Sequence, residues 1–376
     1  LHVEEDRLME LLTLNAQYQP AKAIENWDSL LWVERFNTIS DFKLETGMVS
    51  EYMSILPEGT VLTLRESNVP MIVETHQIER KKNTPQKLII TGRSFTSILD
   101  RRAAIQSVAA LTGSANWNVN VKTPSDLAYY IINKICVEGQ VSAADIFPAA
   151  QVQFPTPADY LTSTGPTKSF SVDRGNLLEI VLKLLQTEAA ADPTTTPATP
   201  AIAQHGIRAV RPNQNGTAIA IEIYTGVDRR STVYFDVTRD LLDDGNYLFS
   251  KVGSKNAAYG VAAGLAATMY EGAVEPTGLN RRVVLVDAST SGIADPTILK
   301  NAMSQSLAEA SETAMFDGSI NQELSPYIYG VDYGLGDIVR TVGDYGLDQA
   351  SRVTEFIRSE DKSGRKAYPT LQALTV

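Results

Sequence analysis

The chain has 376 residues, more than a single hydrophobic core normally organises, so it is expected to fold as several domains. Hydrophobic residues make up 43% and charged residues 20% of the sequence, a balance typical of globular proteins that excludes general disorder. The formal net charge of -11 repels nucleic-acid phosphates and therefore disfavours stable binding to DNA or RNA.

The first part of the chain contains short runs in which apolar and polar residues alternate. Alternation gives a strand one buried face, and polar or Pro-Gly turns separate the runs. Residues 8–14 are apolar and fit a short helix and an edge strand equally well. Strands are expected at residues 30–36, 42–46, 60–66, 71–79 and 87–91. Consecutive antiparallel strands of this kind predict a small barrel or sandwich.

Three segments in the next part of the chain have apolar residues at helical spacing. The first covers residues 95–108 and is expected to close the barrel. The second has a clear start signal, because Thr123 suits the N-cap, Pro124 the first helical position and Asp126 the capping box. The third covers residues 175–188, with leucine, isoleucine and valine on one side.

The middle of the chain opens with residues 189–204, which contain three prolines and no periodicity, and predict a long loop or mobile insertion. Further on, Asn215-Gly216 is a strong hairpin signal, because glycine accepts positive φ. The remaining elements expected here are strands at residues 207–211, 218–224, 233–237, 257–262 and 281–286 and a helix at residues 295–315.

The C-terminal part returns to strands. They are expected at residues 338–342, 352–358 and 367–371, and the charged turn 359–366 separates the last two. The N-terminal strands follow the same order and spacing around the charged turn 80–86. The pattern favours a repeated barrel unit, although residue identity between the two parts is too low to prove a duplication.

Residues that commonly carry catalysis or bind metals are few and scattered. Cys136 is the single cysteine, which excludes an internal disulfide, fits a reducing cytosol and, among apolar neighbours, predicts a buried hydrophobe. His2, His76 and His205 are far apart and in no metal-ligand spacing. No run is apolar enough for a membrane span and no signal peptide is evident, so a soluble protein is expected.

Four short motifs resemble functional sites but lack a necessary residue or context. Residues 92–96 lack the final glycine of a nucleophile elbow, and residues 334–339 lack the third glycine of a dinucleotide loop. In residues 240–245, Leu242 stands where a calcium loop needs an oxygen ligand. Residues 215–217 match a glycosylation sequon, which without a secretory route is simply a turn. No catalytic, cofactor-binding or metal-binding residue is therefore predicted.

Several segments, taken in order, resemble a known family, the siphophage minor tail proteins related to the baseplate hub. The segments are residues 29–36 with 41–44, 97–102, 226–229, 255–260, 333–337 and, at the end of the chain, 368–371. Each motif is weak by itself, and none is a catalytic fingerprint. The resemblance rests on the ordered set, which spans most of the chain.

The resemblance implies an α+β, mainly β fold with two tail-tube-like antiparallel β-barrel domains and an intervening mixed α/β region. The implied domains are residues 1–112 with a closing helix, residues 113–315 with the insertion at 189–204, and residues 316–376, completed by strands from the middle region. Three copies of a two-barrel chain present six similar barrels, so a three-fold hub could dock on a six-fold tail tube.

The resemblance also implies a function and partners. It describes a structural virion protein of the tail tip, made in the host cytoplasm, that forms a homotrimeric baseplate hub. The implied partners are the tail tube or distal tail protein, the tape-measure protein and central fibre or spike proteins, with DNA only in transit. No enzyme activity, cofactor or stable membrane association is expected. A wall-degrading or carbohydrate-active tail protein, using paired carboxylates, remains the alternative, and a receptor-binding module is a third reading.

Overall fold

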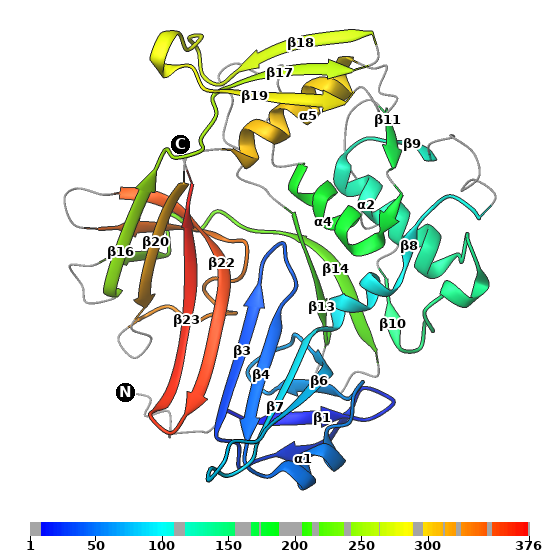
Figure 1. The fold of residues 1–376 in the computed structure, drawn as a ribbon, viewed down its shortest axis with the longest axis vertical. Coiled ribbons are helices and arrows are strands. Elements are labelled where there is room, and N and C mark those ends of the chain that lie inside the picture. The colour runs from blue at the N-terminus through cyan, green and yellow to red at the C-terminus, as the bar shows by residue number, and fades with distance from the viewer. Residues whose placement is uncertain are drawn as a thin grey trace. The chain divides into compact units, whose positions relative to one another are not determined.

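The computed structural model divides the chain into two compact units, whose strands and helices are labelled in Figure 1. Unit 1 contains residues 1–182, 206–224 and 354–370, and unit 2 contains residues 183–205, 225–353 and 371–376. The structure describes residues 9–108, 117–154, 167–172, 174–187, 205–212, 218–236, 242–262, 264–288, 296–310, 313–320, 325–343 and 348–374. Strands dominate the described residues, which confirms the predicted mainly β fold.

Unit 1 is built on an antiparallel sheet that joins the two ends of the chain. Its strands are β1 (Leu11–Leu14), β2 (Pro20–Ile24), β3 (Ser29–Arg35), β4 (Asp41–Thr46), β5 (Val61–Leu64), β6 (Met71–Glu79), β7 (Lys87–Ser94) and the end of β22 (Asp348–Asp361). The strand order within the unit is β22-β3-β4-β7-β6-β5-β1-β2. The predicted strands at 30–46 and 60–91 are confirmed, and residues 8–14 contain a strand that pairs on both sides.

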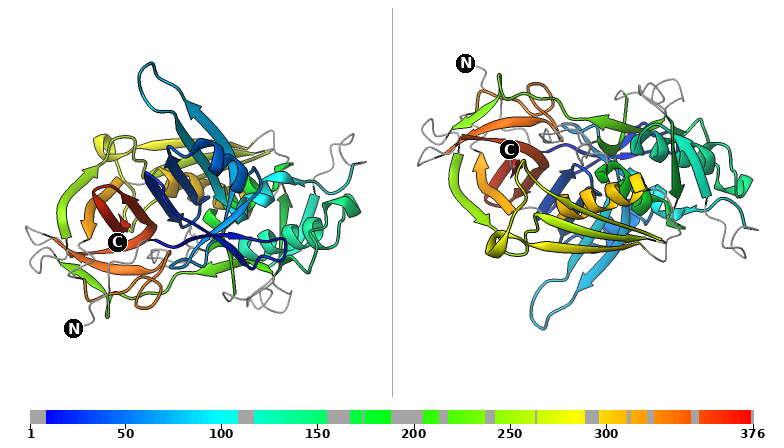
Figure 2. Two further views of the ribbon diagram at one scale, coloured as in Figure 1. Left: turned by 90° about the horizontal axis from the view of Figure 1, so that it is seen from below. Right: turned by 90° about the horizontal axis from the view of Figure 1, so that it is seen from above.

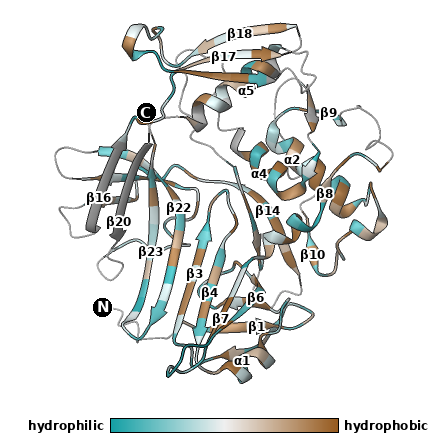
Figure 3. Cartoon of the chain, in the orientation of Figure 1, coloured by the Kyte–Doolittle hydropathy of each residue, from teal (hydrophilic) through white to brown (hydrophobic). Residues whose placement is uncertain are grey.

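The core of unit 1 follows from the alternation of residues along these strands. Figure 3 shows hydrophobic and hydrophilic positions alternating along β3 and β4. Trp32 and Phe42 lie on the buried face, with ring centroids 5.8 Å apart. Helix α1 (Val49–Ile55), which the sequence did not predict, adds Tyr52 to the same cluster.

The prediction of one helix over residues 95–108 is wrong. Residues Phe95–Arg101 form a 3-10 helix, η1, and the chain then extends into β8 (Ala103–Ala104). Strand β8 pairs with β12 (Gly175–Asn176), so backbone pairing ends the helix. The helical spacing of the apolar residues gave a wrong prediction because one of them, Val108, is 64% exposed and belongs to no buried helical stripe.

The other helices of this part are confirmed. Helix α2 (Pro124–Ile132) begins with the predicted capping box: the Asp126 amide donates to Thr123 Oγ1, and the Thr123 amide donates to Asp126 Oδ2, both at 3.1 Å. A π turn, η3 (Asn133–Val137), and a 3-10 turn, η4 (Ala143–Asp145), follow α2. The third predicted helix is α4 (Leu177–Thr187).

Short strands complete unit 1. Strands β9 (Trp117–Val121) and β11 (Lys168–Val172) pair antiparallel. A separate sheet has the order β10-β14-β13, formed by β10 (Val152–Gln153), β13 (His205–Val210) and β14 (Ile219–Thr225). The neighbouring β13 and β14 agree with the predicted hairpin. Its turn at 213–217 and the segment 189–204 lie outside the described residues.

Unit 2 contains three sets of strands. Strands β15 (Tyr234–Asp236), β21 (Ile338–Val342) and the start of β22 are neighbours, as are β16 (Leu242–Ser250), β20 (Thr313–Ile320) and the end of β23 (Gly364–Ala373). The third set has the order β18-β17-β19 and contains β17 (Ala257–Ala262), β18 (Leu265–Tyr270) and β19 (Val283–Ala288), with the short turn η6 (Gly278–Asn280) before β19.

The helix expected over 295–315 is shorter than predicted. Helix α5 (Pro296–Glu309) ends where β20 must begin, because residues 313–320 pair antiparallel with β16. One face of the β18-β17-β19 sheet packs against α5, through Leu299, Met303 and Leu307. The sequence did not predict β16, β18 or β20.

Candidate interaction surfaces

Titratable side chains do not converge on a catalytic or metal-binding centre in the part of the chain that the structure describes. No three His, Cys, Asp or Glu residues gather there in a group that could hold a metal ion. In unit 1, His76 Nε2 lies 2.7 Å from the carbonyl oxygen of Leu56. In unit 2, His205 Nδ1 lies 2.8 Å from the hydroxyl of Thr225. Each of these two rings has a local structural partner, and His2 lies outside the described residues.

Cys136 is buried, as the sequence predicts. Desolvation raises the pKa of its thiol to about 12, outweighing the opposite influence of Arg102. Because the thiolate is the nucleophilic form, this side chain is inert at neutral pH. Its role is to fill space beside Ile135 in the π turn after α2.

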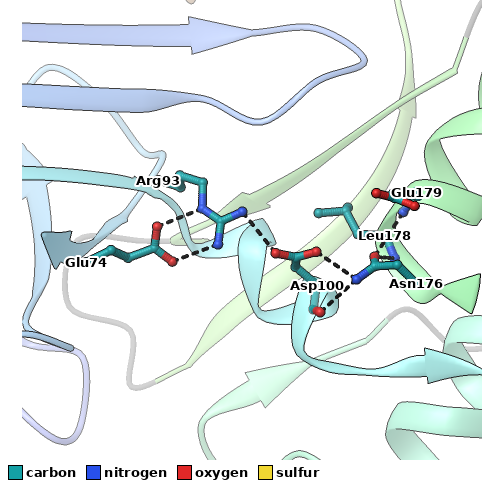
Figure 4. Close-up of polar contacts among 6 residues, drawn as sticks. All are labelled: Glu74, Arg93, Asp100, Asn176, Leu178 and Glu179. Atoms are coloured by element: carbon teal, nitrogen blue, oxygen red, sulfur yellow. Dashed lines mark hydrogen bonds and ion pairs between the residues drawn. The ribbon is translucent and has the colours of Figure 1, made fainter.

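In unit 1, the segment 97–102 takes part in a network of hydrogen bonds and ion pairs that connects separate elements, which Figure 4 shows and which we call a joint. Arg93 on β7 donates from Nε to Glu74 Oε2 at 2.7 Å and from Nη2 to Glu74 Oε1 at 3.0 Å, a two-point contact. Its Nη1 donates to Asp100 Oδ2 at 3.0 Å. The hydrogen bond to Glu74 is the main cause of a raised pKa of the Arg93 guanidinium, which stays charged.

The same joint continues to the start of α4. The Asn176 amide donates to Asp100 Oδ1 at 2.7 Å, and its own Oδ1 accepts the backbone N–H groups of Leu178 (2.9 Å) and Glu179 (3.2 Å). Asn176 therefore caps the helix. Since each carboxylate oxygen of Asp100 accepts a donor from another element, the row of polar groups positions a helix on a sheet.

The segment 29–36 forms a second joint, with the end of β22. Glu34 and Arg358 make a buried ion pair, and Arg358 Nη2 donates to the Glu66 carbonyl oxygen at 3.1 Å. On the other face of β3, Arg35 Nε donates to Glu355 Oε1 at 2.7 Å. These contacts fasten a strand from the end of the chain to one near its start.

The segments 226–229 and 333–337 meet in unit 2, where the buried carboxylate of Asp337 joins them. Asp337 Oδ1 accepts the Val227 amide at 2.7 Å, and Oδ2 accepts the Gly334 amide at 2.9 Å and Arg229 Nε at 3.2 Å. The two backbones approach so closely that a Cβ on Gly226 would lie 1.8 Å from the Gly336 carbonyl oxygen. Only glycine fits this position.

A loop at residues 328–333 leads into the segment 333–337. Tyr333 packs edge-on against Phe235 and Tyr329, with ring centroids 5.6 and 5.7 Å apart. The Gly330 amide donates to the Tyr333 carbonyl oxygen at 2.7 Å, which closes the loop. The loop exposes 62% of Ile328 and 71% of Val331 to solvent. Neighbouring exposed aliphatic side chains of this kind are suited to contact another protein.

The segment 255–260 lies in the β18-β17-β19 sheet. Gly260 faces α5, and a Cβ there would lie 2.4 Å from Met303 Sδ, so the helix packs closely against the strand. On the opposite face, register places exposed Tyr259 beside exposed Leu285. This sheet therefore buries one face and presents apolar side chains on the other.

The structure places parts of two motif-like segments in strands. Residues 334–339 enter strand β21 rather than a helix, so no helix N-terminus faces a phosphate. Leu242, within the calcium-like run, begins strand β16. The sequon at 215–217 lies outside the described residues. None of the described helices is both long and apolar enough to cross a membrane.

No site residue was predicted from the sequence, and the joints around Asp100, Glu34 and Asp337 were missed as contacts. The sequence held one signal for them, since all three residues belong to the segments that carried the family resemblance. Their partners are distant in the chain: Arg358 stands 324 positions after Glu34. A single sequence gives no means to pair such residues.

Comparison with solved structures shows the same fold in phage proteins. The chain is similar to the 43 kDa tail protein of prophage MuSo2 from Shewanella oneidensis, with 11% identity, 96% and 97% of the two chains covered, and a TM-score of 0.55. It is similar to the tail protein from Neisseria meningitidis MC58, with 11% identity, 97% and 96% coverage, and a TM-score of 0.57. It is also similar to prophage tail protein gp18 from Listeria monocytogenes EGD-e, with 10% identity, 97% and 94% coverage, and a TM-score of 0.55.

Sequence comparison gives the family directly. No curated protein matches the chain. The family model described as Siphovirus ReqiPepy6 Gp37-like protein matches residues 9–371, which is nearly the whole chain and includes every described joint. This match confirms the resemblance to a siphophage family that the ordered segments indicated. The chain belongs to the Siphovirus ReqiPepy6 Gp37-like protein family.

Proposed function

We propose that this protein is a structural component of the phage tail, and that it forms the homotrimeric baseplate hub at the tail tip. In this role it adapts the six-fold tail tube to a three-fold tip and surrounds the tape-measure protein and the DNA channel. Tail tube or distal tail protein would bind one side, and central fibre or spike proteins the other.

The observation that carries the proposal is a fold likeness over the whole length of both chains. The three prophage tail proteins are covered over 94–97% of their length, so the likeness is not confined to one common module. The siphovirus family match supports the same reading. The polar networks of the described residues join strands, helices and loops, which fits a structural role.

The proposal includes two tube-like barrels in each subunit. One barrel belongs to residues 1–112, and the other to residues 316–376 together with strands from the region 113–315. On this proposal, the barrels would be built from the antiparallel strands β3 to β7 and from the strands β20 to β23. Three subunits would then present six barrel modules to the six-fold tube.

The first test is the oligomeric state of the purified full chain. Sedimentation velocity and light scattering over a range of protein concentrations should show a trimer, and negative-stain images should show a three-fold ring. Immunogold labelling of intact particles should then mark the tail tip. A monomer that is absent from the tail contradicts the proposal.

The second test addresses the enzyme alternative. Zymography against host cell wall should show no clearing by the purified protein at any concentration that gives trimers. Clearing that survives further purification would contradict a purely structural role. Direct adsorption of the isolated protein to host cells would instead favour a receptor-binding module.

A further inference from the structure

The β6–β7 hairpin of unit 1 is longer than the strands that flank it. In Figure 2 the hairpin, in light blue, extends beyond the other strands of its unit. Strand β6 pairs with β5 only through Met71 and Ile72, whereas its pairing with β7 runs on to Glu79. No described strand pairs with the outer edge of β6 between Glu74 and Glu79. The hairpin therefore carries an unused sheet edge.

The end of the hairpin is an ordered turn. The Thr84 amide donates to the Lys81 carbonyl oxygen at 3.2 Å, and Asn83 adopts a φ of 62°, a conformation that asparagine tolerates better than most residues. The backbone of the turn therefore has a defined conformation. Every residue from 80 to 86 is exposed.

The turn concentrates positive charge in an acidic protein. Arg80, Lys81 and Lys82 form the only run of three consecutive basic residues in a sequence with a net charge of -11. Lys81 Nζ lies 3.9 Å from the Glu79 carboxylate, and Lys87 at the base of the hairpin is paired with Glu45.

We infer that this hairpin is an arm between subunits, whose basic turn, Arg80 to Lys82, docks on an acidic surface of a second copy of this chain. A second copy is a suitable partner because its net charge is negative, and a negative surface attracts a cationic turn. The same net negative charge makes the protein as a whole repel phosphate polymers. Contact between a tip and a different surface of the next copy is heterologous, and such contacts form a ring when the rotation between copies closes, as a three-fold hub requires. This inference rests on the proposed hub.

The experiment compares three full-length proteins: the wild type, R80E/K81E/K82E, and the control K362E/R365E/K366E. The control makes the same change in net charge at three exposed residues of unit 1, Lys362 in the turn after β22 and Arg365 and Lys366 at the start of β23. Of these, Lys362 lies 3.4 Å from Asp28 and Arg365 lies 3.7 Å from Glu66. Circular dichroism should show that all three are folded, since the substituted side chains are exposed. Sedimentation velocity at low and high salt then gives the association constant of each.

The wild type and the control should associate alike, while the hairpin variant associates roughly tenfold or more weakly. High salt should lower the association constant of the wild type toward that of the hairpin variant, because salt screens exposed charges. Carbodiimide cross-linking in a mixture of isotope-labelled and unlabelled wild-type protein should join Lys81 or Lys82 to carboxylates of the other copy, and so identify the acidic surface.

Each contrary outcome separates this inference from the proposed function. A hairpin variant that trimerises like the wild type, without cross-links between copies, overturns the arm and leaves the hub intact. In that case the basic residues only keep the open β6 edge from pairing. A wild type that never self-associates overturns the arm, and labelling of particles then decides the hub separately. The inference is also overturned if the wild type binds DNA or anionic vesicles, and the hairpin variant loses this binding but self-associates like the wild type.

Discussion

The two units bury their sheets differently, although both contain strands with alternating residues. In unit 1 the strands from β1 to β7 and helix α1 enclose a large cluster that includes Trp32 and Phe42. In unit 2 the β18-β17-β19 sheet packs one face on α5 and exposes Tyr259 and Leu285 on the other. Unit 1 therefore covers its sheet with its own strands and helix. In unit 2, one face of the β18-β17-β19 sheet stays exposed and is available to another molecule.

The units also differ in how distant segments are held together. In unit 1, charged side chains of β3 form ion pairs with the end of β22, and the backbones of these two strands are also paired. In unit 2, a single carboxylate, Asp337, holds two loops whose backbones touch. The expected consequence is that unit 1 depends on buried charge pairing, while unit 2 depends on close backbone approach at Gly226.

The largest expected effect is in unit 1. Arg358→Met should lower the free energy of unfolding by about 3–5 kcal/mol, because Glu34 then keeps its buried charge without the guanidinium. Urea unfolding followed by tryptophan fluorescence measures it, since Trp27, Trp32 and Trp117 all lie in unit 1. Probes specific to one unit are needed because a chain with two units need not unfold in one step.

Two controls sharpen this prediction. The double variant E34L/R358M should recover much of the loss, because it removes both buried charges. Arg65→Met, at an exposed ion pair with Glu10 in unit 1, should change stability little, since water screens that pair. Equal losses for Arg358→Met and Arg65→Met would contradict the importance of burial.

The next effect is in unit 2. Gly226→Ala should cost about 1–3 kcal/mol, because its Cβ would meet the Gly336 carbonyl oxygen at 1.8 Å and push the two loops apart. Gly334→Ala is the control, since its nearest neighbour would lie 4.0 Å away. Near-ultraviolet circular dichroism of tyrosine, which reports on Tyr329 and Tyr333, should change for the first variant alone.

A smaller effect is expected from acid in unit 1. Hydrogen bonds from Lys43 and then Lys87 lower the pKa of Glu45 from 4.5 to about 2. A carboxyl whose pKa is lowered by folding stabilises the native state above its ordinary pKa, and this stabilisation is lost as pH falls toward about 2. Glu45→Gln should therefore flatten the pH dependence of the urea midpoint below pH 4.5. An unchanged slope would exclude Glu45 as a source of acid sensitivity.

Local signals made part of this fold predictable. The capping box of Thr123 and Asp126 and the alternation in β3 and β4 act within a few residues, so one sequence reveals them. Strands β16 and β20 were missed because their pairing, 242–250 with 313–320, is set by a partner far along the chain. The helix predicted to 315 was too long for the same reason, since strand pairing overrides helical spacing from residue 313.

The candidate surfaces were less predictable than the strands. The ordered segments pointed to the right family, but they did not show that Asp337 would join 226–229 to 333–337 or that Asp100 would reach Asn176. Such contacts follow from tertiary packing. The basic run at 80–82 was visible only as a charged turn, and its place at the end of an extended hairpin came from the structure.

The smallest effect tests whether the outer face of the β18-β17-β19 sheet is free. Leu285 is 67% exposed and its neighbour Val284 packs toward α5, so the two adjacent residues report on opposite faces. Leu285→Ser should change the unfolding free energy by less than about 0.5 kcal/mol, and Val284→Ser should cost roughly 1 kcal/mol. Thermal unfolding by circular dichroism at low protein concentration compares them. If Leu285→Ser is the more damaging, some part of this chain or of a second copy already covers that face, and the contrast between the units disappears.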